Sequence, residues 1–131
     1  KIRLNGNSGV NPDLADDVLR EVLDGLPPKC YRIYACDDKG DQLSSNFERD
    51  PTGQFILRSE FRKMNWSWRP YFLHNLVRMK QYGRGIISTP YRDTETKKET
   101  LTFSCPVKEN VYLFMDFELP EIPEANEDVM G

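Results

Sequence analysis

The chain has 131 residues, 38% of them hydrophobic and 30% charged, a composition typical of a soluble globular domain with one core. Its net charge of −3 and lack of a basic stripe argue against a nucleic-acid partner. The longest apolar run, Val111–Met115, is far too short to span a membrane. We expect one domain over 11–119, a flexible lead-in over 1–10 and an acidic tail or linker over 120–131. Because the chain begins at Lys1, we expect it to be excised from a larger protein.

The three cysteines, Cys30, Cys36 and Cys105, are too few and too oddly numbered for a disulfide framework. A strand predicted between the first two would hold them too far apart to bridge. Free thiols are typical of a reducing compartment, so we expect a cytoplasmic protein. The alternative is the extracytoplasmic sensor region of a membrane receptor whose membrane helices have been trimmed.

Two segments carry apolar residues at helical spacing. Asn11 as N-cap, followed by proline, predicts the start of a long N-terminal helix over 12–25. A second helix is predicted from Pro70 to the glycines that follow residue 82. The first helix is expected to pack on the sheet, or on a second copy of the chain, through the stripe Leu14, Val18 and Val22.

Alternating apolar and polar residues predict the strands. They are expected over 31–36, 42–47, 86–88, 99–107 and 111–119, and the segment from 51 to 64 is ambiguous. The order of helix, two strands, helix and three strands implies an α+β domain with an antiparallel sheet and helices to one side.

Catalytic chemistry is not indicated. The single histidine, His74, has no Cys or His partners at the spacing of a metal site or a triad. Gly83-Arg84-Gly85 lacks the remaining spacing of a phosphate-binding loop. The many carboxylates are not paired for acid–base work. We therefore expect neither an enzyme nor a cofactor in this chain.

The segment 65–72, NWSWRPYF, gathers large rings, a guanidinium and a proline within a few positions. Trp66, Trp68 and Tyr71 carry apolar area with a polar handle, and Arg69 offers a fork of donors. Such a set can stack on a small ligand and bind a carboxylate in bidentate fashion. Equally, the two tryptophans can anchor a core beneath the helix start while Arg69 pairs with a structural aspartate.

Four motifs in order resemble the Cache, or PDC, family of PAS-like sensor domains: WRPYF at 68–72, STPYRD at 88–93, ETLTFSCPV at 99–107 and LFMDFEL at 113–119. A narrower similarity, through RIYACDDKGDQLSSNF at 32–47 and NWSWRPYFLHNLVRM at 65–79, is to the Cache-type sensor C-terminal to EAL domains in bacterial cyclic-di-GMP phosphodiesterases. The resemblance implies a PAS-like five-stranded antiparallel sheet with a small-molecule pocket on one face and catalysis in an attached EAL domain.

In amino-acid-binding members of the Cache family, an arginine and two aromatic residues hold the ligand carboxylate. A tyrosine and a closing-strand aspartate hold the ammonium. The resemblance places these roles on Arg69, Tyr71, Phe72, Tyr91 and Asp116. Phe72 cannot donate a hydrogen bond, which leaves a carboxylate ligand as the expectation. The full expected site is Trp66, Trp68, Arg69, Tyr71, Tyr91, Asp93, Ser104 and Asp116.

We therefore expect a regulatory domain of a bacterial signalling protein that binds a small anionic or zwitterionic metabolite, controls an attached output domain and forms a homodimer. The competing hypothesis is an interaction module that binds no ligand and only mediates dimerisation. The two differ in whether Arg69 and Asp116 face a cavity or satisfy each other in a packed core.

Overall fold

The computed structural model describes residues 11–120. The expected lead-in over 1–10 and all but the first residue of the expected tail lie outside the described residues. Helix α1 spans Pro12–Arg20 and α2 spans Pro70–Tyr82, and two 3₁₀ turns, η1 and η2, span Leu23–Gly25 and Ser59–Phe61. The strands are β1 Cys30–Asp37, β2 Asn46–Arg49, β3 Phe55–Arg58, β4 Ile86–Ile87, β5 Tyr91–Arg92, β6 Glu99–Lys108 and β7 Val111–Glu118.

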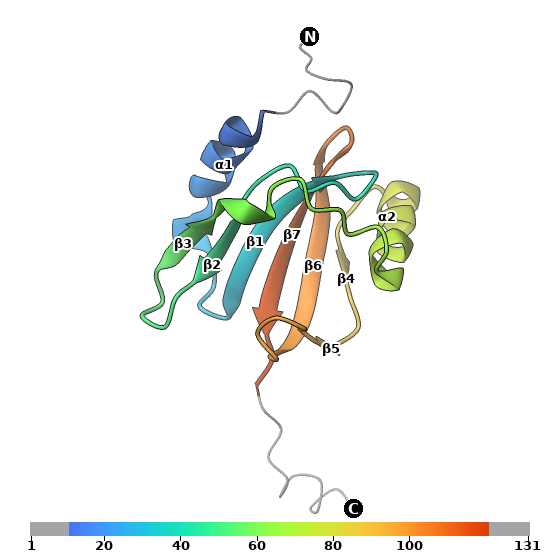
Figure 1. The fold of residues 1–131 in the computed structure, drawn as a ribbon. Coiled ribbons are helices and arrows are strands. Elements are labelled where there is room, and N and C mark those ends of the chain that lie inside the picture. Colours follow the sequence, from blue (N-terminus) through green and yellow to red (C-terminus); the bar gives the residue numbers. More distant parts are fainter. Residues whose placement is uncertain (1–10, 121–131) are drawn as a thin grey trace, which may run out of the picture.

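One antiparallel sheet holds all seven strands in the order β3-β2-β1-β7-β6-β4, with β5 paired to the other end of β6 (Figure 1). The α+β class with an antiparallel sheet is confirmed, whereas the five-stranded count is wrong for this chain. The ambiguous segment 51–64 contributes β3, and the arm around Tyr91 contributes β5. The last two strands lie where alternation predicts them, because Asn110 adopts a left-handed φ of 62° and makes the tight turn between β6 and β7.

The N-terminal helix is shorter than predicted. Its start is as expected, since the Asn11 side chain accepts a hydrogen bond from the backbone N–H of Asp13 at 2.8 Å. The helix ends at Arg20, after nine residues, and the backbone N–H of Val22 bonds to the carbonyl of Leu19 three residues before it. The chain then tightens into η1. The predicted helix over 12–25 is therefore wrong beyond Arg20, because i→i−3 bonds replace helical ones there.

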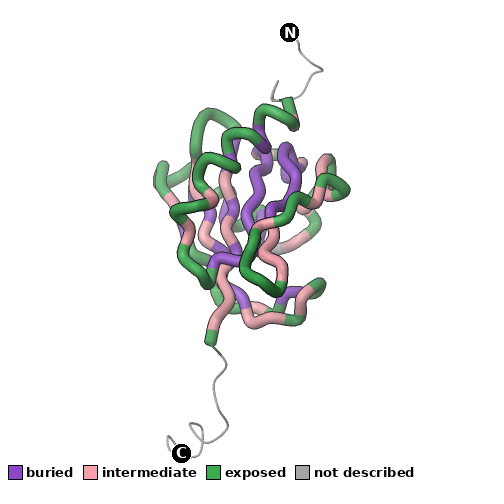
Figure 2. Tube along the Cα trace, turned by 90° about the vertical axis from the view of Figure 1, so that its left-hand side faces the viewer, coloured by how far each residue is buried: buried purple, intermediate pink, exposed green. Residues whose placement is uncertain are grey.

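The two helices lie on opposite faces of the sheet, so the expectation of helices to one side is wrong. Leu19 of α1 packs with Ile33 and Phe47, whereas α2 packs on the face that carries Tyr34 and Phe114. Neighbouring residues of a strand point to opposite faces, so β1 supplies both cores. Figure 2 shows that the buried backbone is concentrated in the central strands.

The α1 face is only partly covered. Leu14, Val18 and Val22 of the predicted stripe are 59%, 55% and 42% exposed, so residues 11–120 leave the stripe largely uncovered. The β6 and β7 residues on the same face are half-buried and form cross-strand pairs: Leu101 with Phe117, Phe103 with Met115 and Cys105 with Leu113. One half of this face is therefore an apolar surface that neither α1 nor α2 covers.

Candidate functional site

A cavity of about 240 Å³ lies on the α2 face of the sheet. Strands β1 and β2 supply its floor, the segment from η2 to the start of α2 supplies one wall, and the turn after β5 supplies the opposite side. Its lining residues are Arg32, Tyr34, Asn46, Phe61, Trp66, Trp68, Arg69, Asp93, Thr94 and Glu95. Its volume lies just under the range of about 300–1,000 Å³ usual for ligand pockets, which suits a small metabolite.

Arg69 and the two tryptophans form one cation–π cluster at the wall. The Arg69 guanidinium carbon lies 4.3 Å from the ring centroid of Trp66 and 5.2 Å from that of Trp68. Contact with two rings limits the positions that a guanidinium can take. Trp68 is 67% exposed, so it forms the outer rim of the cavity.

The inner tryptophan is anchored by a buried amide. The indole N–H of Trp66 donates to the side-chain oxygen of Gln42 at 2.8 Å, and the Gln42 amide nitrogen donates to the side chain of Asn46 at 2.8 Å. Gln42 is 2% exposed. The indole plane is therefore fixed from behind, as expected for a side chain that shapes a binding wall.

The floor of the cavity carries a buried charge network centred on Arg32. Arg32 is 6% exposed and donates to both carboxylate oxygens of Asp93, at 3.1 and 3.0 Å. It also donates to Asp116 at 2.6 Å. Glu95 and Glu48 lie farther out, at 3.4 and 3.6 Å. One buried cation therefore faces four carboxylates.

This network shifts the proton affinities of its members. Burial acts to raise the pKa of Asp93, but the hydrogen bonds and charge of Arg32 outweigh burial and lower that pKa to about 2. Asp116 is more deeply enclosed, and desolvation raises its pKa despite the attraction of Arg32. The two aspartates that share Arg32 therefore differ in proton affinity, with the pKa lowered at Asp93 and raised at Asp116.

The predicted site residues divide into two groups. Trp66, Trp68, Arg69 and Asp93 line the cavity together. Asp116 lies beneath the floor, where it accepts from Arg32 and from the Thr102 hydroxyl at 2.7 Å. The competing hypothesis expects Arg69 and Asp116 to pair with each other in a packed core. In the structure, Asp116 has Arg32 as a charged partner.

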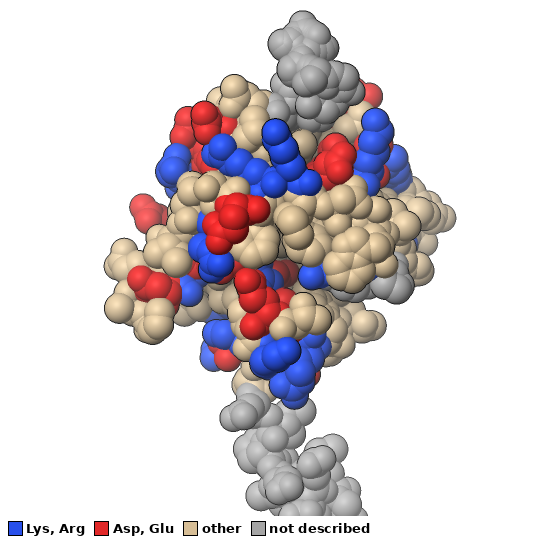
Figure 3. Space-filling model, viewed as in Figure 1, with Lys and Arg blue, Asp and Glu red and all other residues tan. Residues whose placement is uncertain are grey.

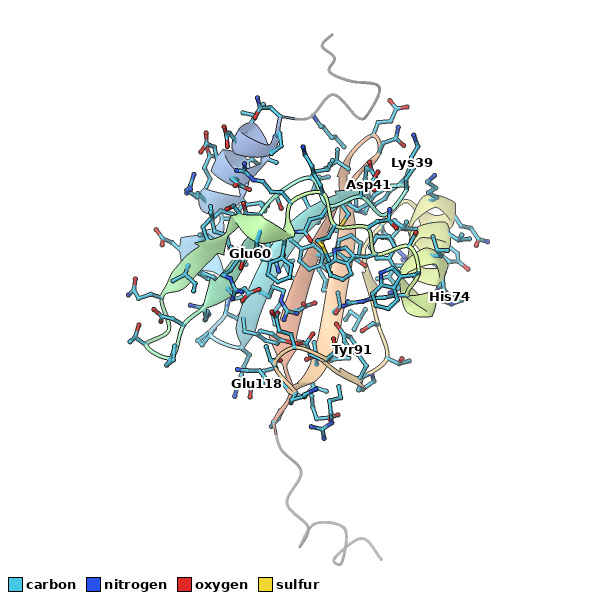
Figure 4. The ribbon with its side chains drawn as sticks, viewed as in Figure 1. Lys39, Asp41, Glu60, His74, Tyr91 and Glu118 are labelled. Atoms are coloured by element: carbon cyan, nitrogen blue, oxygen red, sulfur yellow. The ribbon has the colours of Figure 1, made fainter. Side chains whose placement is uncertain are left out.

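The other predicted residues lie away from the cavity lining. The Tyr91 hydroxyl bonds to Thr102 at the lower end of the sheet (Figure 4). Ser104 is fully buried, and its hydroxyl has no hydrogen-bond partner among residues 11–120. Phe72 is 1% exposed and stacks on Phe114 in the core. The side chain of Tyr71 lies outside the described residues.

Sequence reasoning missed the residue at the centre of the floor. Arg32 stands in a strand whose eight residues are all buried, and a buried arginine implies carboxylate partners close by. That signal is present in the sequence, but the partners are 61 and 84 residues away. Of the other missed lining residues, Phe61 is an apolar side chain in an ambiguous segment, and Glu95 looks like part of a polar turn.

Neither a group of metal ligands nor a membrane-length helix is found in the described part of the chain. No three His, Cys, Asp or Glu side chains between residues 11 and 120 are grouped to hold a metal ion. Over the same residues, no helix has the length and apolar character needed to cross a membrane. His74 lies on the exposed side of α2 (Figure 4). On the face shown in Figure 3, basic and acidic side chains are interspersed.

Comparison with known proteins decides the family. The family model of the EAL-domain associated signalling protein domain (YkuI_C) matches residues 8–125. The chain belongs to this family. The family is the domain associated with EAL domains and is not the EAL domain itself. The association with EAL domains drawn from the sequence is thereby confirmed, whereas the Cache-type sensor classification stays a prediction.

The relative with the same domain is a larger protein. The EAL-domain containing protein YkuI of Bacillus subtilis is 43% identical over 102 residues, which cover 77% of this chain and 25% of YkuI. The crystal structure of YkuI, with an EAL domain, in complex with substrate c-di-GMP and calcium, matches with a TM-score of 0.74 at 41% identity over 78% of this chain and 25% of that chain. The chain thus spans about a quarter of the length of this relative.

A third match is weaker. The ligand-binding domain of the Campylobacter jejuni chemoreceptor Tlp3, solved with 4-methylisoleucine, is 12% identical over 82% of this chain and 38% of that chain, with a TM-score of 0.48. A similarity at this level carries no argument about the cavity.

Proposed function

We propose that this domain senses a small zwitterionic metabolite and regulates an attached EAL phosphodiesterase domain in a cytoplasmic bacterial signalling protein. The observation that carries the proposal is the cavity itself, which places a guanidinium at one end and buried carboxylates at the other. Its family match and the architecture of YkuI support the attached EAL domain.

The outer end of the cavity favours an anionic group. The Arg69 guanidinium contacts both indoles, so its side chain is partly ordered before a carboxylate binds and less side-chain entropy is lost on binding. Phe61 and the tryptophans add apolar walls. Both features fit a compact ligand with an acidic group and some apolar surface.

The inner end favours a cationic group. Four carboxylates surround Arg32, and Glu48 also pairs with Arg58 at 3.2 Å. Among the four carboxylates around Arg32, Glu95 is the member whose side chain remains 45% accessible. We propose that a ligand ammonium binds to Glu95 beside Asp93, rather than to Asp116, which the floor covers. A purely anionic ligand is disfavoured at this end.

A ligand screen with matched variants tests the proposal. The 131-residue chain is screened against a library of amino acids, amines and carboxylates by thermal shift, where stabilisation follows RT ln(1 + [L]/Kd). Zwitterions are expected to stabilise the wild type, and both Arg69→Ala and Glu95→Gln are expected to lose the response. Arg78→Ala, on the exposed side of α2, is the matched control and should respond as the wild type does. Stabilisation by dicarboxylates but not by amines would refute the charge assignment.

Homodimerisation is the second element of the proposal and the basis of the competing function, a ligand-free interaction module. It is supported by a groove of about 300 Å³ beside α1, whose lining includes Leu14, Val18, Val22, Val107 and Val111. Exposed contiguous apolar surface of this kind is typical of protein contacts. Val18→Asp should convert a dimer to a monomer in sedimentation equilibrium. If the wild type is a monomer at every concentration, this part fails.

A further inference from the structure

Arg62 links the wall of the cavity to the helix on the opposite face of the sheet. Its guanidinium donates to Asp16 of α1 at 2.5 Å, to Asp13 at 2.8 Å and to the Ser45 hydroxyl at 3.1 Å. These contacts raise the Arg62 pKa, chiefly through the hydrogen bond to Asp16. Arg62 directly follows Phe61, which lines the cavity.

The acceptor at the other end of this link is deeply buried. Asp16 is 1% exposed and also accepts from the backbone N–H and the hydroxyl of Ser45, both at 2.7 Å. Hydrogen bonds to an ionised carboxylate are about twice as strong as neutral ones. Asp16 lies one turn before Leu19, which packs α1 on the sheet. The position of α1 is therefore set by the same group that holds Arg62.

The backbone bends sharply just after Arg62. Lys63 has a φ of 71°, a left-handed conformation that residues other than glycine rarely adopt. Two backbone hydrogen bonds hold this bend against Gln42. The Lys63 N–H donates to the Gln42 carbonyl at 2.9 Å, and the Gln42 N–H donates to the Met64 carbonyl at 2.7 Å. The bend directs Arg62 toward α1 and sends the following residues along the cavity to Trp66.

A second route joins the same two places. Gln42 accepts from the Trp66 indole and donates to the carbonyl of Ser44 at 2.8 Å. Ser44 in turn donates to the carbonyl of Ser45 at 2.8 Å, and Ser45 binds Asp16. Ser44 and Ser45 are fully buried. Two continuous paths, one through Arg62 and one through Gln42, therefore run from the cavity wall to α1.

We propose that Arg62 and Asp16 form a positioning pair that fixes the cavity wall against α1, so that a change on either side displaces the other. Transmission of ligand binding to α1 rests on the proposed function. The fixing of the wall does not, and it is measured without a ligand. Coupling between two sites is reciprocal, so a perturbation at α1 must reach the wall.

Tryptophan fluorescence reports on the cavity wall. Its two tryptophans are Trp66 and Trp68, and both line the cavity. Native emission and acrylamide quenching are measured for Asp16→Asn and Arg62→Gln. Asp17→Asn, which removes the same charge from an exposed pair with Arg20 on the same helix, is the matched control. Arg62→Lys serves where Arg62→Gln does not fold, since it keeps the charge but loses the fork of donors.

The expected result is a shift of native emission to longer wavelength and increased quenching in Asp16→Asn and Arg62→Gln, but not in Asp17→Asn. Adding Arg62→Gln to Asp16→Asn should give no further shift, because Asp16→Asn already removes the charged acceptor of Arg62. A pair that only stabilises the fold would lower the unfolding midpoint and leave native emission unchanged. Wild-type emission and quenching in folded Asp16→Asn and Arg62→Lys, or additive shifts in the double variant, would overturn the proposal. A failed ligand screen would leave this result untouched.

Discussion

Removal of Arg32 should expose how the cavity floor is held together. In Arg32→Leu, the buried carboxylates of Asp93 and Asp116 lose their charged partner while they stay desolvated. Breaking a buried ion pair from one side costs about 3–5 kcal/mol, which is a large part of the roughly 5–15 kcal/mol that stabilises a typical domain. We therefore expect a severely destabilised but foldable variant.

The assay is urea unfolding followed by circular dichroism. With a denaturant slope of about 2 kcal/mol/M, within the range of small proteins, a loss of 3–5 kcal/mol lowers the midpoint by about 2 M. Arg92→Leu is the matched control, because Arg92 forms an exposed pair with Glu99 at 2.9 Å. Exposed pairs contribute at most about 1 kcal/mol, so the control should unfold near the wild-type midpoint.

The pH dependence of the unfolding free energy should also differ between the wild type and Arg32→Leu. In the wild type, Arg32 holds the pKa of Asp93 at about 2, below its ordinary 3.8. This stabilisation is present above about pH 3.8 and is lost as the pH falls toward 2. Without Arg32, desolvation alone raises the pKa of both aspartates, so protonation favours the folded variant. The difference in unfolding free energy between wild type and Arg32→Leu should therefore shrink from pH 7 to pH 5. A difference below 1 kcal/mol, or one independent of pH, would refute the reasoning.

Three further predictions concern single residues. Burial raises the pKa of Tyr31 to about 12 from 10.0, so the stabilisation that is present below pH 10 is lost between pH 10 and 12. Tyr31→Phe should reduce this loss when the unfolding free energy is measured against alkaline pH. A pH dependence equal to that of the wild type would contradict the prediction. Lys63→Val should lower the unfolding free energy in urea titrations, because a β-branched side chain fits the left-handed φ of 71° less well than lysine does, whereas Lys63→Gly should be tolerated; equal effects would remove the strain argument. Phe114→Ala, at a site 1% exposed between two stacked rings, should cost about 3–5 kcal/mol, and a loss under 1 kcal/mol in calorimetry would show that this core can collapse.

The sequence predicts most of the framework because its patterns are local. Alternation along β6 and β7 indicates both strands, and Asn11 marks the start of α1. The more buried face of β6 is nevertheless the polar one, with Thr100, Thr102 and Ser104. The end of α1 is not predicted, because Val22 continues the apolar spacing although the backbone has already left the helix. Local spacing does not reveal whether a stripe is covered by the same chain.

The cavity is predicted only in its local part. Trp66, Trp68 and Arg69 lie within four positions, so their convergence follows from the chain itself. Asp116 shares their face of the sheet, but it lies below Arg32, whose partners come from segments far apart in sequence. Periodicity gives the face of a residue and not its depth beneath the floor. The positions of the charged side chains at the cavity floor therefore could not be predicted from the sequence.

Calorimetric titration of a ligand from the screen tests the central claim most directly. Loss of one partner of a desolvated charge contact costs about 2–5 kcal/mol, so Arg69→Ala should bind at least about thirtyfold more weakly than the wild type. The folded state of the variant is verified by circular dichroism, and Arg78→Ala should keep wild-type affinity. An affinity of folded Arg69→Ala equal to that of the wild type would contradict the assignment of this cavity as the sensory site.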